Sequence, residues 1–542
     1  MQPRFFAIAS ATLLAIGALA VVWPPVLWSL VLVLPLLLLG IYDRLQTGHA
    51  IRRNFPLFGR GRWLMEALRP FMRQYFAESE VDGVPISRMY RSLVYQRAKG
   101  VDETVPFGTR VDIYQTGYEW ISHSLAAIDV AQVEDLRVQV GGPDCRRPYS
   151  ASIFNISAMS FGALSCNAIL ALNQGAEEGG FAHNTGEGGI TPYHLEHGGD
   201  LVWQIGTGYF GCRDAQGRFC AEAFREKAQL PAVKMIEIKL SQGAKPGHGG
   251  ILPARKNTPE IAAIRGVEPG TLVSSPPVHS AFDSPLGLVR FVAQLREFSG
   301  GKPVGFKLAI GHRSEFVAIC KAMVETGICP DFITVDGGEG GTGAAPLEYT
   351  NSVGMPLREA LAFVVDCLTG FDLKRHIRVI ASGKILSGFH LVKNLAVGAD
   401  MCNSARGMML ALGCVQSLTC NSNRCPTGIT TQDPRLYRGL VVPDKAERVA
   451  RFHAKTVHAT ADLISSAGLH HTRELNRTHI HLRVSQDRTL RYDQIFPCVK
   501  PGSLLTGSVP DAFALHMREA SAERFAPRET LTRFIDEGAD ST

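Results

Sequence analysis

Cysteine is too scarce in this chain to support a disulfide scaffold. Only 12 cysteines occur in 542 residues, whereas disulfide scaffolds are short and dense in cysteine. Three of the 12 lie close together and are considered below. The remaining cysteines are expected to be small core residues in a reducing compartment: Cys145, Cys166, Cys212, Cys220, Cys320, Cys329, Cys367, Cys402 and Cys498.

Charge of one sign is also in short supply, because the net excess is only +6. Much of that excess comes from residues 44–73, where arginines outnumber carboxylates. No interleaving of aromatic and basic residues and no nucleic-acid-binding motif accompanies them. We therefore expect no nucleic-acid partner.

A dinucleotide-binding fingerprint in its usual setting is missing as well. A literal GxGxxG begins at Gly338, but the loop runs on to Pro346 instead of opening a helix. A Rossmann fingerprint opens a helix inside a short βαβ unit and is followed by an acidic strand end, neither of which is present here. We therefore expect no NAD(P)H site in this loop.

Charged residues are absent from two long apolar runs, residues 5–23 and 26–42. Each is close to the roughly 20 residues that cross a bilayer. Pro24-Pro25 separates them and provides a sharp turn, and Trp28 suits an interface. We predict a transmembrane hairpin over residues 1–45. Because basic residues follow it, both ends and the catalytic domain should face the cytoplasm, at the inner (cytoplasmic) membrane.

A secretory signal peptide is the competing interpretation of the first run. Arg4, the apolar stretch and Ala18-Leu19-Ala20 form a passable cleavage pattern. That reading would leave the second run as an anchor and would export the rest of the chain, although its clustered thiols need reducing conditions. A buried hairpin of core helices is a weaker alternative.

Short apolar strands followed by glycine-rich turns and helical stretches begin near residue 150. Such alternation indicates a parallel sheet covered by helices. Residues 46–149 form a basic juxtamembrane and lead-in segment, and residues 436–542 a helical C-terminal extension, with helical spacing over residues 444–467. The predicted strands are residues 152–158, 181–184, 201–205, 235–239, 304–308, 332–335, 378–381 and 400–403.

Three thiols, Cys414, Cys420 and Cys425, stand on one short stretch, and Pro426 follows the last. Thiolates are soft ligands that suit iron–sulfur clusters or zinc. The spacings do not match common zinc patterns, and no fourth ligand follows nearby. We predict a [3Fe-4S] cluster; three unrelated buried thiols are the alternative.

Glycine and serine gather at the ends of the later strands. Backbone N–H groups freed by glycine can cradle a phosphate, and barrels usually hold phosphate after their last two strands. Flavin mononucleotide (FMN) fits such a site. The predicted cofactor-binding residues here are Asp336, Gly337, Gly338, Gly341, Gly343, Ser382, Gly383, Lys384, Ser404, Ala405 and Arg406.

Several segments together resemble the synthase domain of glutamate synthases, in the same order. They are residues 157–162 (SAMSFG), 184–189 (NTGEGG), 238–247 (IKLSQGAKPG), 275–277 (SPP), 340–346 (GGTGAAP) and 413–433, which includes NRCPTGI and TQD. The resemblance covers residues 150–435. It implies an α/β fold, a (β/α)8 TIM barrel, that binds FMN. It includes neither a glutaminase domain nor a β-helical domain.

The resemblance also implies roles for individual residues. Ala158, Met159 and Gln204 would lie along the flavin. Lys239 would stabilise negative charge on the reduced flavin, and Glu187 would orient the imine or relay a proton. The implied substrate-binding residues are Ser160, Gln242 and Lys245.

The implied reaction is reductive amination of 2-oxoglutarate to L-glutamate. The amine donor and the electrons would come from outside the chain, with ferredoxin, a flavoprotein subunit or a membrane quinone pool as electron donors. Two residues, His248 and Glu339, depart from the family pattern, and the change at His248 bears on substrate choice. An enzyme using another amine or amino acid, as in N-methylglutamate synthesis, and a non-catalytic membrane redox module are the alternatives.

Overall fold

The computed structural model describes residues 2–134, 136–507 and 509–527. The chain divides into two compact units, residues 1–88 and residues 89–542. Each unit is described by itself below.

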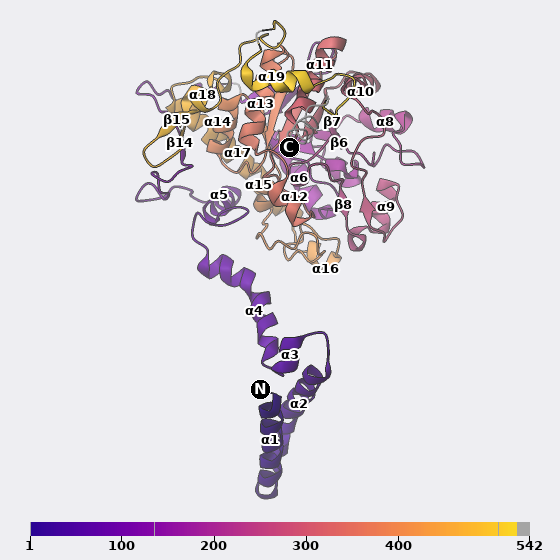
Figure 1. The fold of residues 1–542 in the computed structure, drawn as a ribbon, viewed down its shortest axis with the longest axis vertical. Coiled ribbons are helices and arrows are strands. Elements are labelled where there is room, and N and C mark those ends of the chain that lie inside the picture. The colour runs from indigo at the N-terminus through magenta and orange to yellow at the C-terminus, as the bar shows by residue number, and fades with distance from the viewer. Residues whose placement is uncertain (1, 135, 508, 528–542) are drawn as a thin grey trace, which may run out of the picture. The chain divides into compact units, whose positions relative to one another are not determined.

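Apolar helices dominate the first unit (Figure 1). Helix α1 (Gln2–Val22) is followed by a 3-10 turn (Pro24–Ser29) and α2 (Leu30–Leu45). The stretches Arg4–Val22 and Pro24–Leu45 are both long and apolar enough to cross a membrane. The two predicted apolar helices are therefore confirmed. Length and composition alone identify them, so their insertion into a bilayer stays a prediction.

Shorter helices complete this unit. They are α3 (Ala50–Asn54), α4 (Gly59–Met72) and a π-helical turn (Arg73–Ala77), and α5 (Arg88–Lys99) follows at the boundary. The sequence assigned no role to this stretch.

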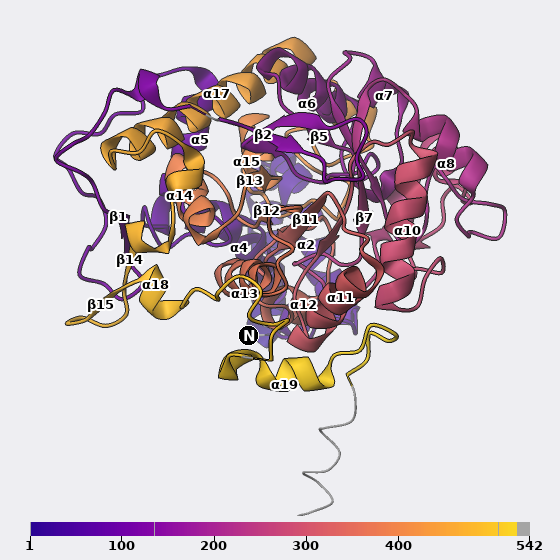
Figure 2. The same ribbon diagram turned by 90° about the horizontal axis from the view of Figure 1, so that it is seen from above.

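The second unit is built on a closed parallel barrel, in the order β10-β11-β12-β13-β4-β5-β6-β7. Figure 2 shows the barrel strands within a ring of helices. The predicted barrel and all of its strands are confirmed, with small shifts at the ends. The strands are β4 (Phe154–Ile156), β5 (His183–Asn184), β6 (Leu201–Ile205), β7 (Val233–Lys239), β10 (Val304–Leu308), β11 (Phe332–Asp336), β12 (Arg378–Ser382) and β13 (Met401–Ser404).

Nearly every barrel-strand residue is buried, as expected for strands that are covered by helices outside and by side chains inside. Pairing of Cys402 with Phe154 and of Lys307 with Lys239 closes the ring. The surrounding helices are α6 (Cys166–Gly179), α7 (Pro192–Leu195), α8 (Ala221–Ala228), α9 (Pro259–Arg265), α10 (Pro285–Phe298), α11 (Arg313–Thr326), α12 (Leu347–Ser352), α13 (Leu357–Gly370), α14 (Gly388–Val397) and α15 (Arg406–Ala411).

The C-terminal extension is only partly helical. Helix α17 (Val442–Ser466) confirms the predicted helix and packs against α6. Strands β14 (Ile480–Arg483) and β15 (Thr489–Arg491) then form a small antiparallel sheet with β1 (Glu119–Ile121) of the lead-in segment. The remaining elements are β2 (Arg137–Val140), β3 (Tyr149–Ser152), β8 (Ile251–Leu252), β9 (Val273–Ser274), α16 (Pro434–Tyr437), α18 (Tyr492–Ile495) and α19 (Asp511–Glu519). The predicted C-terminal tail includes residues 528–542, which lie outside the described residues.

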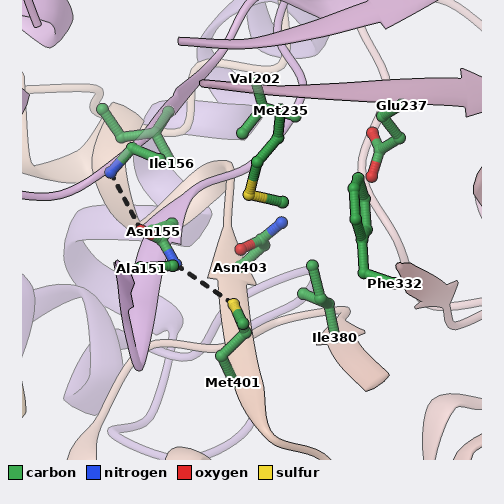
Figure 3. A pocket seen from close by; sticks show the side chains of 11 residues that line it. Ala151, Asn155, Ile156, Val202, Met235, Glu237, Phe332, Ile380, Met401 and Asn403 are labelled. Carbon is green, nitrogen blue, oxygen red and sulfur yellow. Dashed lines mark hydrogen bonds between the residues drawn. The ribbon is translucent and has the colours of Figure 1, made fainter. Parts of the chain in front are cut away.

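Side chains fill the barrel interior near the beginnings of the strands. Figure 3 shows Val202, Met235, Ile380 and Met401 converging there. The cavity between them measures about 10 Å³, about the space of one water molecule. This part of the barrel is a packed core, so chemistry must occur at the opposite end.

Candidate functional site

An ion pair between Lys239 and Glu187 marks the carboxyl end of the barrel. Lys239 is the last residue of β7, and Glu187 lies in the glycine-rich turn after β5. The Lys239 Nζ atom is 2.9 Å from Glu187 Oε1, and both side chains are almost buried. The structure thus brings together the two residues that the sequence named for chemistry.

Two further cations lie within electrostatic reach of the Glu187 carboxylate. Burial by itself would raise the pKa of Glu187, but Lys239, with Arg265 and Lys245 beyond it, holds this pKa below its usual range. Burial lowers the pKa of Lys245 to about 8, and Lys239 adds to the effect. Burial also lowers the pKa of Arg265 to about 10. Three cations surround one carboxylate, so the site has an excess of positive charge that an anionic ligand would balance.

Arg265 was missed by the sequence analysis. Its guanidinium donates to the Phe161 carbonyl at 2.8 Å and lies 5.0 Å from the centre of the Phe210 ring. Its Nε has no partner among the described residues. Arg265 is the last residue of helix α9. Nothing in the neighbouring sequence indicates that this basic residue is buried.

Glycines let the backbone approach the Glu187 carboxylate closely. A Cβ atom at Gly206 would lie 2.6 Å from one carboxylate oxygen, and a Cβ at Gly250 would lie 2.2 Å from the other. Any side chain at these positions would displace Glu187. The turn after β6 and the loop before β8 therefore shape this site.

Glu237, on β7, is a second residue that the sequence analysis missed. Its side chain is buried in the barrel and accepts hydrogen bonds from Asn184 Nδ2 at 2.8 Å, Gln204 Nε2 at 2.7 Å and Thr334 Oγ1 at 2.6 Å. Gln204, predicted to line the flavin, is thus held by Glu237. The sequence signal that could have identified Glu237 is a carboxylate inside an apolar strand.

His279 holds the backbone of Lys239 through a hydrogen bond. Its Nε2 donates to the Lys239 carbonyl at 2.8 Å, and its Nδ1 lies 3.0 Å from the Tyr209 hydroxyl. Burial lowers the pKa of His279 to about 4. This neutral histidine therefore fixes the end of β7 without adding charge.

The loops predicted to bind phosphate meet beside this ion pair. The Gly337 N–H donates to the Ser382 carbonyl at 2.9 Å, and an Arg406 guanidinium nitrogen donates to the Glu339 carbonyl at 2.6 Å. The loops at the ends of β11, β12 and β13 are therefore joined by hydrogen bonds. The N–H groups of Gly341, Gly343 and Lys384 find no protein acceptor within the described part of the chain.

Lys384 and Arg406 bring positive charge to the same place. Burial lowers the pKa of both groups, and Arg406 further lowers that of Lys384. Lys384 has a left-handed backbone, with φ at 50°. Two adjacent cations and free N–H groups match the needs of a phosphate.

Asp336 serves a different purpose from the glycines that follow it. Its carboxylate is 3.2 Å from Lys307 Nζ and accepts the Gly243 N–H at 2.8 Å. Both contacts are made by its Oδ2 atom, so we interpret Asp336 as a brace between the loops after β7 and β11.

The predicted substrate residues lie in the loops after β4 and β7. Lys245 Nζ donates to the Ala344 carbonyl at 2.9 Å, and the Lys245 N–H donates to Gln242. Ser160 lies against the turn that carries Glu187, because a Cβ at Gly186 would meet the Ser160 nitrogen at 2.6 Å. Ala158 and Met159 belong to the same loop as Ser160.

The cysteine segment is attached to that loop. Gln432 Nε2 donates to the Gly162 and Leu164 carbonyls, at 3.1 and 2.7 Å. Lys256 Nζ bridges the Ala163 and Cys420 carbonyls, at 2.8 and 3.3 Å. The cysteine segment is therefore joined to the loop that carries Ala158 and Met159, two of the residues expected along the flavin.

Two of the three thiols act electrostatically on the third, Cys414. Burial raises the pKa of Cys414 to about 11, and Cys420 and Cys425 add to this shift. Hydrogen bonds from Thr427 and Thr430 outweigh burial and lower the pKa of Cys425. No set of three metal-ligating side chains is assembled among the described residues, so the cluster stays a prediction.

A cavity larger than the one inside the barrel lies elsewhere. It measures about 510 Å³ and opens outside the barrel, between α7 and α8. Its lining includes Ile190, Pro192 and Leu230 but none of the predicted site residues.

Comparison with known proteins identifies the family of the chain. The conserved region in glutamate synthase matches residues 127–470. The chain is 34% identical over 495 residues to the glutamate synthase large subunit-like protein YerD of Bacillus subtilis (strain 168), covering 84% of this chain and 94% of YerD. It is 34% identical over 329 residues to an archaeal NADPH glutamate synthase of Methanocaldococcus jannaschii, covering 60% of this chain and 61% of that protein.

A structural comparison finds mandelate oxidase with benzoyl-formic acid, at 16% identity and a TM-score of 0.41, over 68% of this chain and 87% of that one. The conserved region of glutamate synthase spans more than half of the chain, and YerD aligns over most of it. The chain belongs to the glutamate synthase family.

Proposed function

We propose that this protein is an FMN- and iron–sulfur-dependent glutamate synthase-like oxidoreductase. It would convert 2-oxoglutarate, ammonium, two electrons and two protons to L-glutamate and water. The observation that carries the proposal is the buried Lys239–Glu187 ion pair, with Lys245 and Arg265 beside it and the phosphate-binding loops next to it.

The site suits a substrate with two carboxylates. Lys245 and Arg265 are buried cations that Glu187 only partly compensates, and an anionic ligand would supply the missing charge. Glu187 would then hold the nitrogen of the substrate imine by accepting its hydrogen bond, and Lys239 would keep Glu187 ionised for that task.

Bound FMN would supply the hydride for the reduction. The free N–H groups of Gly341, Gly343 and Lys384 and the side chain of Arg406 would hold its phosphate. Lys239, at the end of β7, would place positive charge near the ring. These residues fit the cofactor, because the barrel brings them to the carboxyl ends of neighbouring strands.

Cys414, Cys420 and Cys425 would hold the [3Fe-4S] cluster that delivers electrons. The effect of Cys420 and Cys425 on the pKa of Cys414 supports this assignment, as does the attachment of Cys420 through Lys256 to the loop after β4. The apolar helices α1 and α2 would anchor the enzyme in the inner membrane, with an external amine donor and an external electron donor such as ferredoxin.

The test uses anaerobically purified full-length protein in detergent. Flavin and iron contents are measured, the protein is reduced with dithionite, and 2-oxoglutarate with ammonium is added. Reoxidation of the flavin with formation of glutamate is the expected result. If both cofactors are present and the flavin stays reduced, the substrate assignment is wrong; methylamine in place of ammonium then tests the N-methylglutamate alternative. Absence of both cofactors after reconstitution would refute the enzyme proposal.

A further inference from the structure

Helix α4 and the π-helical turn after it expose an unusual number of large apolar side chains. Phe71 is 57% exposed and Phe76 81% exposed. The other exposed apolar residues of this stretch are Leu64, Met65, Leu68, Met72 and Tyr75. So many exposed apolar side chains on one short helical stretch mark an interaction site.

These side chains lie on one face of the helix. Leu64, Leu68, Phe71 and Tyr75 follow one another at intervals of four and three residues, which places them along a single stripe. Met65 and Met72 broaden the stripe. The opposite side carries arginines at positions that fall away from this stripe: Arg62, Arg69 and Arg73.

An ion pair ties the first turn of α4 to the last turns of α2. Arg60 donates to both carboxylate oxygens of Asp43, at distances between 2.7 and 3.1 Å, and the Leu57 N–H adds a bond to the same carboxylate. The Asp43 side chain is completely buried. Breaking such a pair would be costly, because it would leave an uncompensated buried charge. The pair therefore holds the start of α4 beside the end of α2.

Helix α3 reinforces this corner. A Cβ at Gly59 would lie 2.9 Å from the Ile51 carbonyl oxygen, so α3 and α4 touch backbone to backbone. The Trp63 ring packs edge-on against His49, with ring centres 5.1 Å apart, and Arg52 lies 4.3 Å above it. The start of α4 is thus fixed relative to the end of the second apolar helix.

We propose that α4 lies in the membrane interface, with its apolar stripe among the acyl chains and its arginines toward anionic lipid headgroups. The proposal rests on the anchoring role proposed above for α1 and α2. If α2 crosses the bilayer, its last turn reaches the headgroup region, and the Asp43–Arg60 pair starts α4 there. Arginine on the polar side and bulky apolar residues on the other are typical of helices that lie on membranes.

Photo-crosslinking of the full chain tests this inference. The protein is reconstituted in vesicles of equal parts phosphatidylglycerol and phosphatidylcholine, with benzoylphenylalanine in place of one residue at a time. Leu68 samples the apolar stripe, and Glu66, on the polar side of the same helix, is the matched control. Leu32, an exposed residue of α2, reports on the hairpin. We expect several-fold more lipid adduct from position 68 than from position 66.

The outcomes separate the two proposals. Lipid adducts at position 32 without any at position 68, or protein adducts at position 68, would overturn the interfacial helix and leave the anchor intact. Lipid adducts at position 68 with none at position 32 would refute the anchor alone. In vesicles of phosphatidylcholine only, and in the combined Arg62→Gln, Arg69→Gln and Arg73→Gln variant, adducts at position 68 should fall several-fold. An unchanged yield would refute the role of anionic lipid.

Discussion

The Lys239 ammonium and the Glu187 carboxylate, from different strand ends of the barrel, lie 2.9 Å apart at its mouth. Lys239 is paired within the protein, and the same pair holds Glu187 in its charged form. Glu187 therefore depends on Lys239 for its charge state, and each side chain holds the other in position.

Replacing Lys239 with methionine should reduce kcat by about 10² or more, because a positioned charge at the reacting centre contributes on that scale. Bound flavin, measured by absorbance, should be largely retained. Lys234→Met, on the same strand but paired with Asp200 at the surface, is the control and should keep its activity. Equal activity of the Lys239 and Lys234 variants would contradict the role given to Lys239.

Lys245 should impose an alkaline limit on kcat/KM. Its pKa is lowered to about 8, so the free enzyme loses this cation as the pH rises through about 8, and binding of a dicarboxylate weakens. The pH profile of kcat/KM should fall above that value. Lys245→Arg should move the fall to higher pH, since arginine stays charged.

Lys302 provides the comparison for that profile. Burial also lowers its pKa to about 8, but its Nζ donates to the Ala228 and Leu230 carbonyls, away from the site. Lys302→Arg should therefore leave the alkaline fall in place. If this variant rather than Lys245→Arg abolishes the fall, the assignment is wrong.

Lys384 should contribute to flavin affinity rather than to the fold. Removing its charge as Lys384→Gln should raise the Kd for FMN about tenfold or more, since a hydrogen bond to a charged group contributes about 1.5–3 kcal/mol. The melting temperature of the cofactor-free protein should not fall. Fluorescence titration with FMN measures the Kd of the wild type and of Lys384→Gln. The control is Lys374→Gln, which loses an ion pair with Asp400. An unchanged Kd would remove Lys384 from the phosphate site.

Loss of any one of the clustered thiols should remove the iron–sulfur cluster. We expect Cys414→Ser, Cys420→Ser and Cys425→Ser each to lose the iron signal in electron paramagnetic resonance and most bound iron. Cys498→Ser, at an exposed cysteine, should keep both. Wild-type protein without iron after anaerobic reconstitution would favour three unrelated thiols.

Glu237 should be required for stability. Glu237→Gln places an amide where three donors point, and we expect it to lower the free energy of unfolding by about 3 kcal/mol. Denaturant titration followed by tryptophan fluorescence measures the loss. Glu226→Gln, at an exposed position of α8, should change nothing. A loss as small as that of the control would mean that Glu237 does not hold the barrel network.

The barrel and the glycine-rich loops at its strand ends could be predicted from sequence because both are local patterns. Short apolar strands ending in glycine or serine recur at regular intervals, and parallel strands place their carboxyl ends at one edge. Lys239 and Glu187 could be named because each stands in a recognisable motif beside such an end. The apolar helices followed from the absence of charge over two long runs.

The sequence alone therefore determined the fold class, the family and the segments proposed to carry the chemistry. Only the tertiary structure decided which side chains meet: that Glu237 gathers Asn184 and Gln204, that Arg265 is buried beside Glu187, and that Asp43 holds the start of α4. Such contacts join residues far apart in the chain. Their energies depend on burial and distance, which arise only when the chain is folded.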